Sequence, residues 1–275
     1  MSVMQPTDAT AADSGVEIDI QQVQKIYETR AGEEVRALEC IDQHIAPGEF
    51  VSIVGPSGCG KSTLLAILAG LLEQDHGTVR INSQLVTRSH PRMAVVFQRD
   101  LLLKWRTVED NILLPVEVKG WKISEYRPRA RDLMKQVGLI DFARKYPDEL
   151  SGGMRQRVAI CRALVQQPGL LLMDEPFGAL DALTREQMTI DLQRLWRRIN
   201  NTVVFVTHSI DEAIFLSDRV LVMSPRPGKI DLDLKIDIPR PRRLAGRTSP
   251  QFLSYLESIR STFERQGVLV EEDVS

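Results

Sequence analysis

Hydrophobic and polar residues alternate along some parts of this chain and run together in others, and the two patterns predict different kinds of strand. From Val16 the stretch VEIDIQQV alternates apolar and polar positions, which predicts a half-buried strand, and a turn at Pro47-Gly48 precedes a second strand, EFVSIVG. Three later runs, MAVVF, LLLMD and TVVFVTH, are apolar without alternation. Continuous runs of this length are typical of parallel strands that helices cover on both faces.

Helical periodicity fills the segments between these strands. KSTLLAILAGLL follows the second strand and predicts a helix that ends at the turn His76-Gly77. Between residues 99 and 164 the stretches WRTVEDNILLPVEV, ISEYRPRARDLMKQVGL and MRQRVAICRALV all have helical patterns, and no strand pattern interrupts them. Thr184–Asn200 carries an apolar stripe at helical spacing, formed by Met188, Leu192, Leu195 and Ile199. Strands that alternate with helices predict an α/β fold, with a helical subdomain inserted at about residues 99–164.

The chain length of 275 residues fits one large domain with such an insertion. Residues 1–15 are small and polar, and we expect them to form a disordered tail. The α/β domain is expected to span residues 16–236. Residues 237–275 form a short extension, rich in proline and arginine at first (IPRPRRLAGR) and helical afterwards (QFLSYLESIRSTFER).

A glycine-rich loop between a predicted strand and a predicted helix is the first sign of chemistry. GPSGCGKST matches the pattern G-x-x-x-x-G-K-[ST], and the glycines let backbone N–H groups turn inward around phosphates. Lys61 is placed to reach the terminal phosphates, and the Ser62 hydroxyl to ligate Mg²⁺. A glycine turn without function is the alternative, but the strand–loop–helix context argues against it. The loop therefore predicts ATP and Mg²⁺ as cofactors, bound by Gly55, Pro56, Ser57, Gly58, Cys59, Gly60, Lys61, Ser62 and Thr63.

Two adjacent carboxylates end one of the buried strands. LLLMDEP places Asp174 and Glu175 where open α/β sheets bind their ligands. Asp174 is suited to holding Mg²⁺ through its water shell, and Glu175 to polarising the attacking water as general base. Such a pair alone would be weak evidence, but downstream of a phosphate loop it predicts hydrolysis of ATP.

The stretch LSGGMRQRVAI at Leu150–Ile160 connects these features to a family. Together with GPSGCGKST, VVFQ, LLLMDEP, GALD and TH, in this order, it resembles the nucleotide-binding domain of an ABC transporter over residues 16–236. The resemblance implies a P-loop NTPase fold, with a mostly parallel core sheet, an antiparallel N-terminal β subdomain and the inserted helical subdomain. It also implies an ATPase that works as a pair of subunits.

The resemblance implies roles for further residues of the same subunit. Gln98 matches the Q-loop glutamine, which senses Mg²⁺ and the attacking water. His208 matches the switch histidine that touches the γ-phosphate, and Ser209–Glu212 predicts a capping box that starts a helix directly after it. Tyr27 is the candidate aromatic residue that stacks on adenine, with a place in the core as the alternative. The implied catalytic residues are Glu175, His208, Lys61 and Gln98, and the implied metal ligands are Ser62, Gln98 and Asp174.

Other residues would act on nucleotide bound by the partner. Ser151, Gly152 and Gly153 of LSGGM would contact the γ-phosphate of ATP held by the other subunit, and Asp181 in GALD would lie at the dimer seam. Each ATP would then lie between Lys61 of one subunit and the signature motif of the other. Isolated monomers are expected to bind ATP and to hydrolyse it poorly.

Finer features are similar to the ATPases of nitrate, sulfonate, taurine and bicarbonate importers. They include MSPRPGKI at Met223–Ile230 and IPRPRR at Ile238–Arg243. The similarity implies a peripheral protein at the cytoplasmic face of the inner membrane, with permease subunits and, indirectly, an extracytoplasmic solute-binding protein as partners. One departure is Lys104 in LLLKW, where relatives read LLPW, in a segment that should face the permease. The alternatives are a soluble ABC ATPase acting on DNA or ribosomes, and an exporter or lipid-handling ATPase.

Composition narrows the functional classes further. A formal net charge of −2 gives no reason to expect nucleic acid as a partner. The cysteines Cys40, Cys59 and Cys161 are odd in number and lack a CxxC pair, which disfavours a disulfide framework and a zinc site. No secretory signal is visible, and no stretch approaches the roughly 20 apolar residues of a membrane-spanning helix.

Two short basic clusters, residues 127–131 and 240–247, have no assigned role. They could contact anionic lipid or nucleic acid. Because each cluster is short and the protein is acidic, we expect both to be solvated surface instead.

Overall fold

The computed structural model describes residues 15–269, and the disordered tail expected at residues 1–15 lies, except for Gly15, outside that range. At its centre is a six-stranded sheet in the order β10-β9-β3-β8-β7-β6. All neighbours in it are parallel except β9 and β10, so the prediction of a mostly parallel core sheet is confirmed. The strands are β3 (Phe50–Val54), β6 (Met93–Val96), β7 (Leu170–Asp174), β8 (Thr202–Val206), β9 (Arg219–Met223) and β10 (Ile230–Lys235).

A second, antiparallel sheet has the order β2-β1-β4-β5, which confirms the N-terminal β subdomain. Its strands are β1 (Ile18–Glu28), β2 (Glu34–Ile45), β4 (His76–Ile81) and β5 (Gln84–Leu85). Helix α1 (Lys61–Leu68) shares one hydrophobic core with both sheets. On β3, Val51 and Ile53 face this core and Phe50 and Val54 face the other, so the strand before the glycine loop is buried on both sides.

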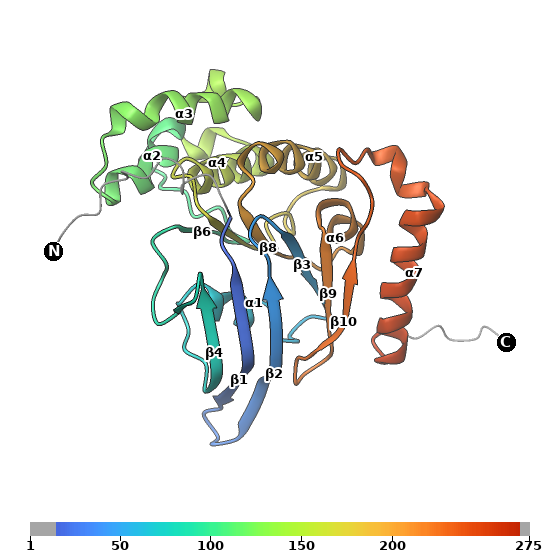
Figure 1. The fold of residues 1–275 in the computed structure, drawn as a ribbon. Coiled ribbons are helices and arrows are strands. Elements are labelled where there is room, and N and C mark those ends of the chain that lie inside the picture. The colour runs from blue at the N-terminus through green and yellow to red at the C-terminus, as the bar shows by residue number, and fades with distance from the viewer. Residues whose placement is uncertain (1–14, 270–275) are drawn as a thin grey trace.

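Six further helices pack into the second hydrophobic core, on the other face of the central sheet. In Figure 1, α2 and α3 lie at one end of this helical layer and α7 stands at the other end, beside β10. The helices expected between residues 99 and 164, at Thr184–Asn200, after His208 and in the C-terminal extension all form. They are α2 (Val108–Val118), α3 (Ile123–Gln136), α4 (Gly152–Leu164), α5 (Ala182–Ile199), α6 (Ile210–Leu216) and α7 (Pro250–Arg265). Within residues 15–269, none of the helices has the length and apolar composition that crossing a membrane requires.

Two local predictions were wrong. The helix after the glycine loop ends at Leu68, because Gly70 takes a left-handed conformation (φ 64°) and closes it. The residues His76-Gly77, expected to end that helix, instead begin β4. Strands β2, β4, β5, β9 and β10 were not predicted. In β2 the alternation is irregular, and Cys40 (φ 50°) interrupts its extended backbone.

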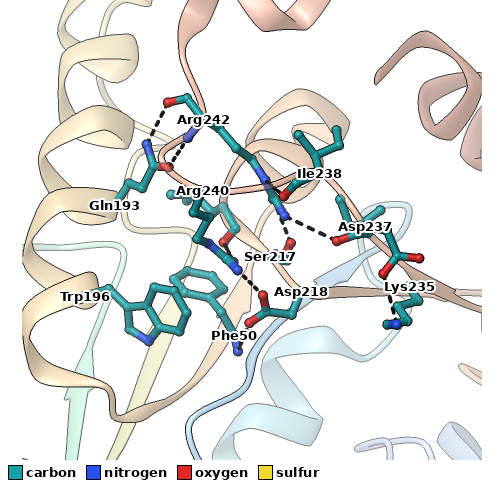
Figure 2. Close-up of polar contacts among 12 residues, drawn as sticks. Phe50, Gln193, Trp196, Ser217, Asp218, Lys235, Asp237, Ile238, Arg240 and Arg242 are labelled. Atoms are coloured by element: carbon teal, nitrogen blue, oxygen red, sulfur yellow. Dashed lines mark hydrogen bonds and ion pairs between the residues drawn. The ribbon is translucent and has the colours of Figure 1, made fainter. Parts of the chain in front are cut away.

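Two arginines of the second basic cluster, Arg240 and Arg242, are not solvated surface, which corrects the prediction for them, whereas Arg243 is exposed as expected. Arg242 is only 7% exposed, and its guanidinium donates to the Ser217 carbonyl (2.7 Å) just after α6. Figure 2 shows Arg240 paired with Asp218 and lying beside Trp196. The guanidinium carbon is 4.5 Å from the centre of the Trp196 ring. Burial lowers the pKa of Arg242 to about 10, which still leaves it charged at neutral pH. Protein carbonyls and a carboxylate, rather than water, therefore surround these two arginines.

Candidate active site

The glycine-rich loop leaves the end of β3 and turns into α1. Gly58 (φ 75°) and Gly60 (φ 106°) have left-handed backbone, which residues with a Cβ rarely adopt. A Cβ on Gly60 would also lie 2.8 Å from the Ala37 carbonyl oxygen. Gly60 is the N-cap of α1 and has no side chain to cap the helix, so the unpaired N–H groups of its first turn face the loop. Such a helix start attracts anions.

Lys61 is folded into the loop itself. It is 5% exposed, and its ammonium donates to the carbonyls of Gly55 (2.9 Å) and Pro56 (3.0 Å). Cys59 is 1% exposed, with its Sγ 3.9 Å from the same ammonium. Burial raises the pKa of the Cys59 thiol despite the nearby Lys61 charge, which favours a packing role over redox chemistry.

Two oxygen donors meet beside the loop. β7 ends at Asp174, and the Ser62 hydroxyl donates to its carboxylate at 3.0 Å. Burial raises the pKa of Asp174, and the neighbouring Glu175 adds to that effect, while the Ser62 hydrogen bond and Lys61 oppose it. The sequence separates these two donors by more than a hundred residues, and the parallel sheet brings them together.

Glu175 is the next residue along the strand and points to the end of β8. Its backbone has φ 43°, an uncommon conformation for a residue with a side chain, and its N–H donates to the Val206 carbonyl (2.9 Å). Oε2 lies 3.3 Å from Nδ1 of His208. Residues held in such backbone conformations cluster at functional sites.

The helix expected after His208 forms, although the capping box is incomplete. Ser209 caps α6 by accepting from the Glu212 N–H at 3.3 Å. The Glu212 carboxylate accepts from the Thr207 hydroxyl (2.6 Å) rather than from the Ser209 N–H, which donates to that same hydroxyl (3.0 Å). The Thr207 hydroxyl therefore bridges the Ser209 N–H and the Glu212 carboxylate, and connects the turn at His208 to α6.

Gln98 lies close to Glu175, the residue expected to polarise the attacking water. A Cβ on Gly178 would be 3.4 Å from Gln98 Nε2 and 3.7 Å from Glu175 Oε2, so both side chains converge on that glycine. Gln98 itself is exposed, just beyond β6. The structure thus gathers Gln98, Glu175 and His208 at one edge of the core sheet.

A cleft of about 420 Å³ opens over the loop. Tyr27 lines it from β1, is 41% exposed, and has its hydroxyl 3.4 Å from Thr63 Oγ1, so it is not a core residue. Gly55, Pro56 and Cys59 lie outside the lining. The lining residues are Tyr27, Thr29, Val35, Ala37, Ser57, Gly58, Gly60, Lys61, Ser62, Thr63, Glu175 and Arg226.

The residues expected to act on the partner's nucleotide form a separate surface. Ser151 caps α4 by accepting from the Met154 N–H (3.3 Å), and Asp181 caps α5 by accepting from the Thr184 N–H (3.1 Å). A Cβ on Gly153 would lie 2.4 Å from Thr184 Cγ2, so these two helix starts pack directly against each other. Hydrogen bonds from Thr184 hold the pKa of Asp181 below its usual range. Among the described residues, none of Ser151, Gly152, Gly153 and Asp181 lines the cleft over the loop.

Sequence reasoning missed four residues of the cleft. Thr29, Val35 and Ala37 come from β2 and the turn before it, a hairpin that the sequence pattern did not resolve. Arg226 comes from the MSPRPGKI stretch, which was noted only as a mark of subclass. An arginine between two prolines was the available signal, but nothing in the chain order says what it faces.

Comparisons with known proteins agree with this geometry. The family model described as ABC transporter matches residues 38–178. An uncharacterized ABC transporter ATP-binding protein of Methanocaldococcus jannaschii is 45% identical over 89% of this chain and 90% of its own. The taurine import ATP-binding protein TauB of Rhizobium johnstonii is 44% identical, over 89% and 95%, and the aliphatic sulfonates import ATP-binding protein SsuB of Bacillus cereus is 40% identical, over 92% and 98%.

A solved structure shows the same fold in another member. It is a dimeric post-hydrolysis state of the ATP-binding cassette MJ0796 bound to ADP and Pi, with TM-score 0.70 and 34% identity, covering 81% of this chain and all of that one. Three findings indicate the same family: a family match over half the chain, relatives at 40% identity or more, and a shared cassette fold. This chain belongs to the ABC transporter family and is one of its ATP-binding ATPase subunits.

Proposed function

We propose that this chain hydrolyses Mg–ATP in the cleft above Gly55–Thr63 and that the hydrolysis drives import of a small sulfonate. The observation that carries the hydrolysis is the meeting of two pairs at the cleft, Ser62 with Asp174 (3.0 Å) and Glu175 with His208 (3.3 Å). The first pair offers oxygen ligands beside the phosphate loop. The second offers a carboxylate whose orientation a histidine fixes, as a general base requires.

The donor set fits magnesium. Mg²⁺ prefers hard oxygen ligands and takes few of them from protein, the rest being water and substrate phosphate. Ser62 and Asp174 supply a hydroxyl and a carboxylate, with the amide of Gln98 nearby as a third candidate. Among residues 15–269, no group of three or more His, Cys, Asp or Glu side chains is placed to hold a metal ion.

Within this site each residue has a separate task. Lys61 and the loop N–H groups bind the phosphates, and Tyr27 stacks on the base from the β1 side of the cleft. Glu175 takes a proton from the attacking water, and His208 holds the Glu175 carboxylate and the terminal phosphate in place. Bound Mg²⁺ would neutralise phosphate charge as the bond to the leaving group breaks.

Replacement of the base tests the hydrolysis proposal. Glu175→Gln keeps the size and the His208 contact but cannot accept a proton, so ATP binding should persist while turnover falls by about 10²–10⁴-fold. Glu125→Gln, on the exposed face of α3, is the matched control and should leave turnover unchanged. Turnover in Glu175→Gln equal to that of the control would remove Glu175 from its proposed role.

The functional unit is proposed to be a homodimer docked on a permease at the cytoplasmic face of the membrane. Ser151 and Asp181 lie on an exposed surface outside the cleft, so a second copy is needed to bring them to a bound nucleotide. The solved relative is a dimer. A solute-binding protein outside the membrane would deliver the cargo, since the cleft of this chain is proposed to bind nucleotide and not the transported solute.

Taurine or another aliphatic sulfonate is the proposed cargo, because the relatives named above are import ATP-binding proteins for these compounds. The sequence features are also similar to those of nitrate and bicarbonate importers, so uptake of these two anions is the control. A strain lacking this chain should lose uptake of labelled taurine or alkanesulfonate and keep uptake of nitrate and bicarbonate. Loss of nitrate uptake alone would assign the chain to a different importer, without affecting its ATPase activity.

A further inference from the structure

The loop Ser224–Lys229, between β9 and β10, lies against the phosphate loop. Gly228 forms a bridge to Leu38 on β2: its N–H donates to the Ala37 carbonyl (3.0 Å), and its carbonyl accepts from the Glu39 N–H (3.0 Å). Ala37 is itself part of the cleft lining. The loop is thus fixed to a strand that forms one wall of the nucleotide cleft.

Gly228 also brings the backbone of this loop close to the phosphate loop. A Cβ at Gly228 would lie 2.0 Å from the Cys59 carbonyl oxygen and 2.7 Å from Met223 Cε. No side chain larger than hydrogen fits there without moving backbone. Consequently residue 226, two positions earlier, is held within reach of the middle of the phosphate loop.

From this position Arg226 donates two hydrogen bonds to the Gly58 carbonyl. Its Nη2 lies 3.2 Å and its Nε 3.4 Å from the Gly58 carbonyl oxygen, and the side chain lines the cleft. A Cβ on Gly58 would lie 3.5 Å from Nη2, in ordinary contact, so the arginine packs along the glycine as well. Two donors of one guanidinium on one oxygen make a charge-assisted contact of fixed direction.

The direction of that carbonyl determines the direction of an N–H group. In a planar trans peptide the C=O and the following N–H point to opposite sides. With the Gly58 carbonyl turned out to Arg226, the Cys59 N–H is turned away from the arginine. Its contact with the Pro56 carbonyl is long, 3.4 Å, and a contact of that length is a weak hydrogen bond. The N–H therefore keeps the capacity to donate to a phosphate oxygen.

We propose that Arg226 is a positioning residue of the nucleotide site, which orients the Gly58–Cys59 peptide toward the phosphates of a nucleoside triphosphate and adds a positive charge to the cleft wall. It acts through Gly58 rather than on the water, so it governs affinity and not the chemical step. The inference rests on the proposed role of Gly55–Thr63 as the phosphate site.

The test separates affinity from turnover. In the full-length protein, Arg226→Ala should raise the Kd and KM for ATP about tenfold, the value of one charge-assisted hydrogen bond, while kcat at saturating ATP stays within about twofold. Arg226→Lys keeps a donor and a charge but lacks the paired N–H donors of a guanidinium. It should recover about half of the lost ATP affinity, on a logarithmic scale of Kd. Thermal melting without nucleotide checks that each variant is folded.

Two further variants make every outcome decisive. Lys229→Ala removes a cation from the same loop that pairs with Glu39 (3.1 Å) and does not line the cleft, so its KM should match that of the parent protein. Lys61→Ala tests the proposed phosphate site itself and should abolish ATP binding. If Lys61→Ala abolishes binding and Arg226→Ala leaves KM unchanged, the inference is wrong and the proposed function stands. If Lys61→Ala binds ATP normally, the proposed phosphate site is wrong. If Arg226→Ala is folded and its kcat falls while its KM stays constant, the positioning role of Arg226 is wrong.

Discussion

Two helix starts in this protein are suited to binding phosphate, and they differ in what surrounds them. The start of α1, with the Gly55–Thr63 loop, has Asp174, Glu175 and Tyr27 within the same cleft or beside it. The start of α4 at Ser151 packs against the start of α5 and faces outward, with no part in that cleft among the described residues. Both have glycines and free N–H groups, so the local chemistry is alike.

The difference shows that a phosphate-directed motif is not by itself a site. The α1 start acquires its carboxylates because parallel strands end at one edge of the sheet, where their ligands collect. The α4 start belongs to the helical layer and meets no such edge. Under the proposed function it would complete a site from outside, on a second copy of the chain.

The largest expected effect is complementation between two inactive proteins. Lys61→Ala and Ser151→Asp should each lower hydrolysis by about 10²-fold or more, the second because a carboxylate would oppose the γ-phosphate. Mixed in equal amounts they form heterodimers, half of all dimers, in which one of two sites pairs wild-type Lys61 with wild-type Ser151. Activity should then rise to about a quarter of the parent value, given a symmetric interface. If the mixture hydrolyses ATP only at the average rate of the two separate variants, Lys61 and Ser151 act on nucleotide within one chain.

A smaller effect should separate capping from catalysis. Ser151 and Ser249 both cap helices, each accepting a backbone N–H at 3.3 Å. Replacing either with alanine should cost about 1 kcal/mol of stability. Only Ser151→Ala should also lower hydrolysis, by about tenfold, with ATP binding to the monomer unchanged. Equal hydrolysis in the two variants would reduce Ser151 to a structural cap.

Thiol labelling should show how tightly the α1 half is packed. Cys40 is exposed, whereas Cys59 and Cys161 are buried, and burial raises the pKa of Cys161 to about 12. A maleimide near neutral pH should therefore modify one thiol in the folded protein, Cys40, and all of them after unfolding. Mass spectrometry of digested protein reads the sites directly. Rapid labelling of Cys59 would show that the phosphate loop opens, and would contradict the packing role given to Cys59.

The smallest effect concerns the support behind His208. Burial raises the pKa of Glu212, although Thr207, Arg185, His208 and Arg247 oppose the shift. An acid with a raised folded pKa stabilises the fold below its unfolded pKa, and this contribution is lost as pH rises through the folded value. The melting temperature of Glu212→Gln relative to the parent should therefore increase from about pH 4 to about pH 8. A difference that is constant over this range would mean that Glu212 titrates as in the unfolded chain.

The two basic clusters show why surface chemistry was harder to predict than motifs. In the first, Arg127 and Arg131 are exposed on α3, as expected, and Arg131 pairs with Glu109 at 2.8 Å. In the second, Arg240 and Arg242 are enclosed at the end of α6. The two stretches have similar composition, and a charged side chain is buried only where carbonyls and carboxylates from other elements can satisfy it.

The sequence alone determined the family, four of the six central strands (β3, β6, β7 and β8) and the local chemistry of the phosphate loop, since each depends on short stretches of the chain. Strand type followed from apolar runs, and the loop from glycines that permit left-handed backbone. Only the tertiary structure decided which distant groups meet: Ser62 with Asp174, Glu175 with His208, and Arg226 with Gly58. It also separated Ser151 from the cleft. These outcomes depend on strand order and on which carbonyls remain available, and neither is encoded in any single stretch of sequence.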